Sequence, residues 1–102
     1  MPGDTSLVNG RALEELVREI VADVLVISPD DVRPGASLVR DLGAESIDFM
    51  DLVFRLEDAL GLAIPYTRWQ RFLDTSLAGT DQSVAITPEV VQAFAREEMA
   101  RA

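Results

Sequence analysis

Residues 41–65 of the chain read DLGAESIDFMDLVFRLEDALGLAIP, and this stretch decides the fold. Apolar residues recur in it at helical spacing and predict a helix from Ser46 to Leu60. The expected apolar arc consists of Ile47, Met50, Val53, Phe54, Leu56 and Leu60, with Phe49 and Leu52 at its margins. Charged residues follow on the opposite face: Asp48, Asp51, Arg55 and Asp58. Gly61 supplies a C-terminal stop for this helix.

An earlier helix is predicted upstream of this stretch. Its apolar positions repeat at helical spacing and are Leu13, Leu16, Val17, Ile20, Val21, Val24 and Leu25. Its end is expected at Pro29, because the residue before a proline disfavours the helical region. Residues 28–45 are rich in Pro, Gly and Ser and predict a long loop. We expect Val32, Leu38 and Leu42 to pin that loop to the core.

The C-terminal third predicts two further helices. Tyr66 to Leu77 is expected to form a short one, with apolar positions at Trp69, Phe72, Leu73 and Leu77. Residues 78–87 predict a loop, after which Thr87-Pro88-Glu89 has the residues typical of a helix start. Core contacts are expected from Val90, Val91, Phe94 and Ala95.

The predicted fold class is therefore all-α, a four-helix bundle with three principal helices and one short helix. Residues 1–9 are expected to be a flexible N-terminal tail, and residues 10–102 a single domain.

Charge narrows the range of partners. The chain has 18 acidic and 9 basic residues, a net charge of −9. This balance disfavours nucleic acids and anionic membrane surfaces, both of which attract clustered basic residues. It favours partner proteins that present basic patches.

The chain contains neither Cys nor His. Disulfides, metal sites with thiolate or imidazole ligands, and Ser-His or Cys-His nucleophilic pairs are therefore excluded. We expect no metal, and any reactive thiol must be supplied from outside the chain. No apolar run approaches the roughly twenty residues that span a bilayer, and the N-terminus lacks the features of a secretion signal. We expect a cytoplasmic monomer with no stable membrane insertion.

The segment from Asp41 to Asp48, DLGAESID, resembles the prosthetic-group site of acyl carrier proteins. That site usually reads Leu-Gly, a small or polar residue, and then Asp-Ser-Leu. The resemblance extends without gaps from about Leu42 to Pro65, through the amphipathic helix to its Ile-Pro close. Spacing over this length makes the match far more specific than three residues alone.

The resemblance implies a carrier rather than an enzyme. A separate phosphopantetheinyl transferase would attach the 4'-phosphopantetheine of coenzyme A to Ser46. Acyl groups would then ride on the arm's terminal sulfur as thioesters, presented to enzymes of fatty-acid, lipid or polyketide biosynthesis. A phosphodiester at Ser46 would meet unpaired backbone N–H groups and the positive end of the helix dipole.

The resemblance also implies roles for residues around Ser46. Partner enzymes with basic patches, such as ketosynthases and acyltransferases, would dock on the second helix. The expected docking residues are Glu45, Ile47, Asp48, Asp51, Glu57 and Asp58. Carriers of this family can shelter an acyl chain between their helices, and the candidate lining is Val53, Phe54, Leu60 and Ile64. Apolar residues at helical spacing are more often plain core, which is also our expectation for Met50.

The chain departs from the family pattern at several positions. Glu45 stands where the usual residue is Asp, Ile47 replaces the commoner Leu, and Arg55 interrupts the acidic face. Residues 66–71 are basic and aromatic, and Trp69 after the Ile-Pro turn resembles specialised carriers of very-long-chain fatty acids for lipid A. A secondary-metabolite carrier is equally compatible, and Trp69 as a core anchor is the simpler interpretation.

Other functions stay open at this point. Taken alone, Ser46 would be interpreted as an ordinary helix N-cap. A peptidyl or aminoacyl carrier is the nearest competitor within the carrier class, and an unmodified helical interaction domain is the competitor outside it. An enzyme with paired carboxylates is disfavoured, because the sequence offers no apolar pocket with convergent groups.

Overall fold

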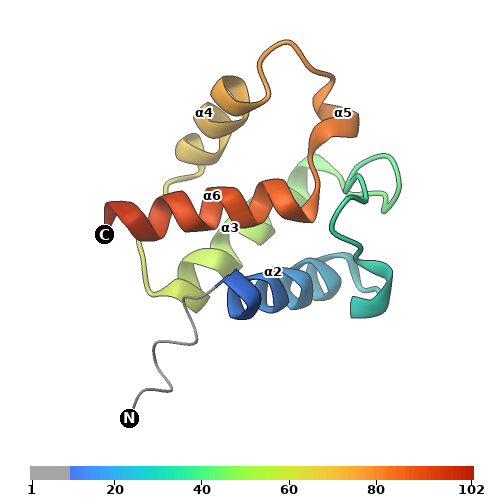
Figure 1. Ribbon diagram of the computed structural model, residues 1–102, viewed down its shortest axis with the longest axis horizontal. Coiled ribbons are helices and arrows are strands. Elements are labelled where there is room, and N and C mark those ends of the chain that lie inside the picture. Colours follow the sequence, from blue (N-terminus) through green and yellow to red (C-terminus); the bar gives the residue numbers. More distant parts are fainter. Residues whose placement is uncertain (1–9) are drawn as a thin grey trace.

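The computed structural model describes residues 10–102, and within them it contains helices and no strand (Figure 1). The predicted N-terminal tail, residues 1–9, lies outside the described residues. The α-helices are α2 (Gly10–Leu25), α3 (Ser46–Leu60), α4 (Tyr66–Ser76), α5 (Gln82–Ala85) and α6 (Pro88–Arg101), and a 3-10 helix, η1, spans Pro29–Asp31. The all-α bundle expected from the sequence is confirmed.

The three longest helices form the body of the bundle. Helix α2 packs against both α3 and α6, and α3 also contacts α4. In Figure 1, α6 crosses the molecule between α4 above it and α2 below it. No helix of residues 10–102 is long and apolar enough to cross a membrane.

Helix α2 ends earlier than the sequence predicts. Its last residue is Leu25, and Val26 adopts a left-handed conformation with φ of 56°. The N–H of Ile27 donates to the Ala22 carbonyl at 2.9 Å, which satisfies a carbonyl that the helix end leaves free. The predicted end at Pro29 is therefore wrong, because the chain turns at a residue type that rarely marks a turn.

The loop between α2 and α3 is held by side chains that pack into the core and by hydrogen bonds to residues near α5. Val32 and Leu38 are buried and Leu42 is half-buried, which confirms the predicted anchors. The buried Ser37 hydroxyl donates to the Ser83 carbonyl at 2.9 Å, and the Leu38 N–H donates to the Ile86 carbonyl at 2.9 Å. These bonds tie the loop to the segment around α5, so the approach to α3 has a fixed course.

Helix α3 has the predicted bounds, but its buried face differs from the predicted arc. The buried residues are Phe49, Leu52, Val53 and Leu56, so Phe49 and Leu52 belong to the centre of the core and not to its margin. Ile47, Met50 and Phe54 are instead 69%, 57% and 65% exposed, and the core prediction for Met50 is wrong. Apolar residues occur on more than one face of this helix. Contacts with α2 and α4, and not periodicity, therefore decide which of them are buried.

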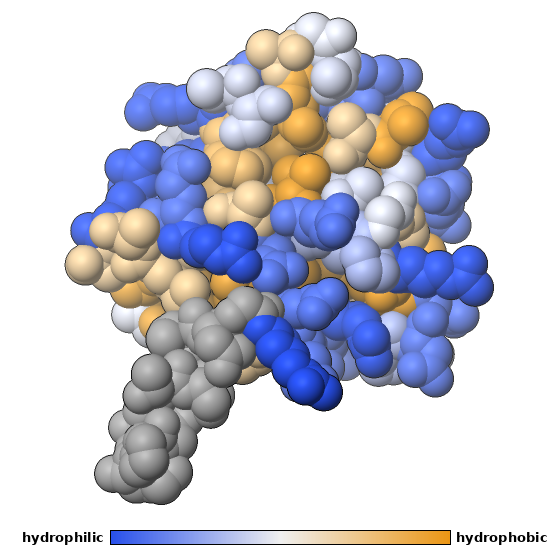
Figure 2. Space-filling view, in the orientation of Figure 1, coloured by the Kyte–Doolittle hydropathy of each residue, from blue (hydrophilic) through white to orange (hydrophobic). Residues whose placement is uncertain are grey.

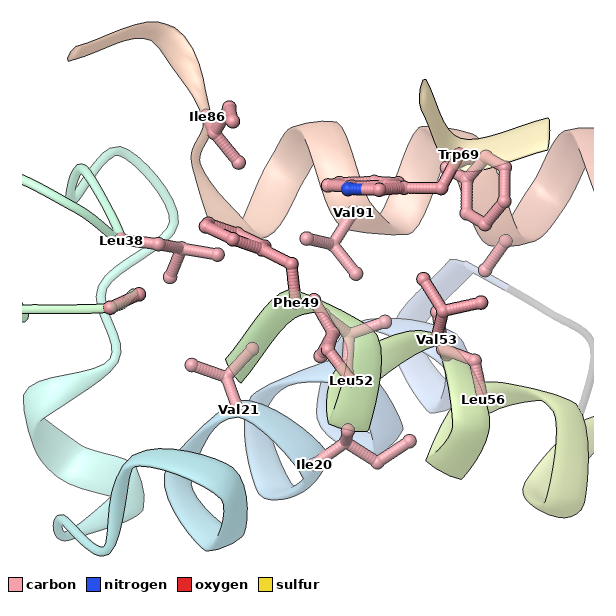
Figure 3. Close-up of a cluster of buried hydrophobic side chains, with 14 of the residues drawn as sticks. Ile20, Val21, Leu38, Phe49, Leu52, Val53, Leu56, Trp69, Ile86 and Val91 are labelled. Carbon is pink, nitrogen blue, oxygen red and sulfur yellow. The ribbon is translucent and has the colours of Figure 1, made fainter. Parts of the chain in front are cut away.

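The C-terminal helices largely follow the prediction. Trp69 and Leu73 of α4 are buried, as are Val91, Phe94 and Ala95 of α6. The Thr87 hydroxyl accepts the Val90 N–H at 3.3 Å and caps α6 as expected. Residues 78–87 are not entirely a loop, because they include the four-residue helix α5. Figure 3 shows α3, α4 and α6 contributing Phe49, Trp69 and Val91 to one continuous core.

Candidate prosthetic-group site

Ser46 is the first residue of α3 and its side chain is exposed to solvent. The N-cap position belongs to Glu45, whose backbone is extended with φ of −115° and ψ of 171°. The interpretation of Ser46 as a simple N-cap is therefore wrong. Within residues 10–102 the Ser46 hydroxyl has no hydrogen-bond partner. A hydroxyl that is exposed and unbonded at a fixed position is suited to modification by another enzyme.

A tight turn delivers the chain to Ser46. The Gly43 N–H donates to the Val39 carbonyl at 3.1 Å, and the Ala44 N–H donates to the Leu38 carbonyl at 2.8 Å. Gly43 has φ of 77°, a backbone conformation that residues with a side chain rarely adopt. The glycine is therefore favoured by its backbone conformation and not by a lack of space, because a Cβ atom there would meet no neighbouring atom. Ala44 is buried and belongs to the core. These two residues therefore fix the approach to Ser46.

Asp48 closes the first turn of α3. One of its carboxylate oxygens, Oδ2, accepts the Glu45 N–H at 2.8 Å. The Glu45 carbonyl in turn accepts the Asp48 N–H at 2.9 Å. The backbone N–H groups of Ser46 and Ile47 belong to the first turn, where a helix offers no carbonyl partner. They, and the helix dipole, favour an anion beside Ser46.

An open groove begins at Ser46 and runs along α4 toward α5. Its volume is about 570 Å³. The apolar floor includes Phe49, Trp69 and Leu73, and the polar lining includes Tyr66, Gln70, Asp74, Gln82 and Ser83. Burial raises the pKa of the Tyr66 hydroxyl above its ordinary value, so this group remains a neutral donor at physiological pH. The exposed hydroxyl, the first-turn N–H groups and this mixed groove together fit a flexible arm that carries a phosphodiester and amides.

The predicted docking residues are divided between two kinds of environment. Glu45, Ile47 and Asp58 are exposed. Asp51 is half-buried and forms an ion pair with Arg55 at 3.1 Å. Glu57 is half-buried and accepts the Ile64 N–H at 2.8 Å, so its carboxylate holds the turn after α3.

Sequence reasoning missed the apolar stripe beside Ser46. Met50 and Phe54 stand three and seven residues after Ile47, so the three side chains share one outward face of α3. Their spacing was visible in the sequence, but the same spacing is typical of a core face. The candidate cleft residues are also divided: Val53 and Ile64 are buried, Leu60 is half-buried and Phe54 points outward. Val53, Leu60 and Ile64 belong to one core cluster, whereas Phe54 is exposed and lies outside it.

Comparisons with known proteins agree with this geometry. A family model described as "Phosphopantetheine attachment site" matches residues 15–68. The chain is also 34% identical over 65 residues to the acyl carrier protein AcpXL of Mesorhizobium japonicum, an alignment that covers 64% of this chain and 70% of that protein. The chain belongs to the acyl carrier protein family.

Membership in the acyl carrier protein family defines the prosthetic group and the general mode of action. The group of this family is 4'-phosphopantetheine, and the terminal thiol of that group supplies the chemistry that a chain without Cys lacks. Acyl carrier proteins are not themselves catalytic, and they work with phosphopantetheinyl transferases and acyl-processing enzymes. Ser46, with the N–H groups of the first turn of α3, is the part of this chain that fits the group.

Proposed function

We propose that this acyl carrier protein holds acyl intermediates as thioesters on a 4'-phosphopantetheine arm attached to Ser46. The observation that carries the proposal is the exposed, unbonded Ser46 hydroxyl at the first residue of α3. The carrier needs no base of its own there, because a separate transferase performs the attachment. Partner enzymes would belong to fatty-acid, lipid or polyketide biosynthesis in the cytoplasm.

The outward face of α3 is the proposed docking surface. It combines the exposed apolar side chains of Ile47, Met50 and Phe54 with the exposed carboxylates of Glu45 and Asp58. An apolar centre with a charged rim is the usual organisation of a protein interface. With a net charge of −9, the chain would be steered toward partners whose docking surface is basic.

The decisive experiment measures intact mass after incubation with coenzyme A and a broad-specificity phosphopantetheinyl transferase. We expect the wild-type mass to rise by one phosphopantetheinyl group and the Ser46→Ala mass to stay unchanged. Ser76→Ala is the matched control, because Ser76 is an exposed serine at the end of α4 and should not affect the attachment. No mass gain with several transferases, on folded protein, would instead favour an unmodified interaction domain.

A further inference from the structure

A second open cleft lies between α4 and the C-terminal part of α6, and we call it the α4–α6 cleft. Its volume is about 250 Å³. Figure 1 shows α4 beside this part of α6. Small-molecule sites usually have about 300–1,000 Å³, so the cleft suits side chains of another protein better than a whole ligand. Its lining from α4 is Arg68, Arg71, Phe72, Thr75 and Ser76, and from α6 it is Phe94, Glu97, Glu98 and Arg101.

Helix α4 separates this cleft from the groove beside Ser46. The groove is lined from α4 by Tyr66, Trp69, Gln70, Leu73 and Asp74. Each α4 residue of the cleft follows one of these by two positions, which is about 200° around a helix. Among the residues that the structure describes, none lines both the groove and the cleft. A partner in the cleft therefore leaves Ser46 accessible.

Arginine is in excess in the α4–α6 cleft, although the chain as a whole is acidic. The carboxylate of Glu98 is only 3% exposed and lies 2.9 Å from Arg68 and 3.5 Å from Arg101. Glu97 lies 3.8 Å from Arg101. Arg71 is exposed and has no carboxylate partner within residues 10–102. Three guanidinium groups and two carboxylates therefore leave one positive charge in the cleft, on Arg71.

The cleft also offers hydrogen-bond donors that suit a carboxylate. Arg68 donates from Nη2 to the Ala63 carbonyl at 3.2 Å, but its buried Nε–H has no hydrogen-bond partner within the described part of the chain. Buried polar groups usually have such a partner. The hydroxyls of the exposed Thr75 and Ser76 add further donors. A guanidinium group beside these donors favours a carboxylate, which it can bind through two parallel hydrogen bonds.

The floor of the cleft is aromatic. Phe72 is half-buried, and its ring centroid lies 5.3 Å from that of the buried Phe94. Figure 2 shows hydrophobic residues at the surface in the upper half of the view, with hydrophilic residues around them. An apolar centre with a polar rim is the usual organisation of a protein interface, in which aromatic residues and arginine are enriched.

We infer that the α4–α6 cleft is a second docking surface, which binds an acidic segment of a partner protein. An apolar side chain of that segment would contact Phe72, and a carboxylate would pair with Arg71. The charge of this cleft is opposite to that of the outward face of α3, so the two surfaces select partner segments of opposite charge. The inference goes beyond the proposed function, because it requires no arm at Ser46.

The test titrates the full chain with two short acetylated and amidated peptides and follows backbone amide chemical shifts. In one peptide Glu residues flank a central Leu, and in the other Lys replaces Glu. We expect the Glu peptide to shift the amides of Arg71, Thr75 and Glu97 in a saturable manner. Gln82 and Ser83, which line only the groove, should stay unchanged. The Lys peptide should not bind in the cleft.

Two variants with the same change in net charge locate the interaction. Arg71→Gln should raise the Kd of the Glu peptide by roughly fivefold, because it removes the unpaired guanidinium. Arg96→Gln is the matched control and should leave Kd unchanged, because Arg96 is exposed on α6 outside the cleft. Equal Kd values for the two variants, shifts that do not saturate, or equal binding of the Lys peptide in the cleft would overturn the inference. Ser46→Ala should bind the Glu peptide like wild type, so a failure of the proposed function, seen as an unchanged mass, would leave this test intact.

Discussion

Both the inner and the outer side of α3 carry large apolar side chains, but the two sets have opposite environments. The inner face carries Phe49, Leu52, Val53 and Leu56, and all four are buried against the rest of the bundle. The outer face carries Ile47, Met50 and Phe54, each more than half exposed. Burying a side chain of this size stabilises the fold by about 1.5–3 kcal/mol, and the outer face forgoes that gain. A helix that carries both faces separates the residues that hold the fold from the residues available to a partner.

The largest expected effect is a difference in stability between one substitution on the inner face of α3 and one on its outer face. Leu56→Ala removes a fully buried side chain and should lower the free energy of unfolding by about 2–5 kcal/mol. Phe54→Ala removes a larger side chain from the outer face and should change it by no more than about 0.5 kcal/mol. Urea unfolding followed by circular dichroism measures both values.

The same outer-face variant should affect recognition. Phe54→Ala is expected to lower kcat/KM of the transferase for the carrier by roughly fivefold, equivalent to about 1 kcal/mol of lost interface contact. Equal destabilisation by the two variants, with recognition unchanged, would show that the outer face belongs to the fold and not to docking.

Two neighbouring carboxylates of α3 allow the same comparison of inner and outer residues, with a smaller expected change in stability. Glu57 accepts the Ile64 N–H from a half-buried position, whereas Asp58 is exposed. Glu57→Ala leaves that N–H without its partner and should cost about 1–2 kcal/mol in thermal or urea unfolding. Asp58→Ala should leave unfolding unchanged, but should reduce the rate of association with a basic partner and weaken its dependence on salt. The comparison would fail if both variants had the same effect on stability.

The distinction between the two faces of α3 shows what the sequence can and cannot predict. The bounds of α3 follow from local signals, the turn before Ser46 and the stop at Gly61, and the start of α6 follows from Thr87 and Pro88. The proposal that Ser46 carries the arm rests on the motif around it. Which apolar residues of α3 are buried does not follow, because they spread over more than one face of the helix and only contacts with α2 and α4 decide between them.

Two other features depend on interactions that no local pattern encodes. The role of Glu57 arises from a hydrogen bond to a residue seven positions later, across the turn after α3. The aromatic stack joins Phe49, Trp69 and Phe94, which lie on three different helices. The family match ends at Arg68, so Phe94 lies in a part of the chain for which the resemblance offers no expectation.

Substitution of Val26 has the smallest expected effect on stability. Val26 is an exposed apolar residue that belongs to neither face of α3. It is 88% exposed, but it lies beyond α2 and its exposure accompanies a left-handed backbone with φ of 56°. That conformation costs a side chain with a Cβ atom about 1–2 kcal/mol, and glycine avoids the cost while losing more backbone entropy on folding. Val26→Gly should therefore stabilise the protein by about 0.5–1 kcal/mol and leave arm attachment unchanged. Phe54→Ala should show the reverse, unchanged stability with weaker recognition. If Val26→Gly also slowed arm attachment, the docking surface would extend beyond α3 to the end of α2, and exposure on α3 alone would not define it.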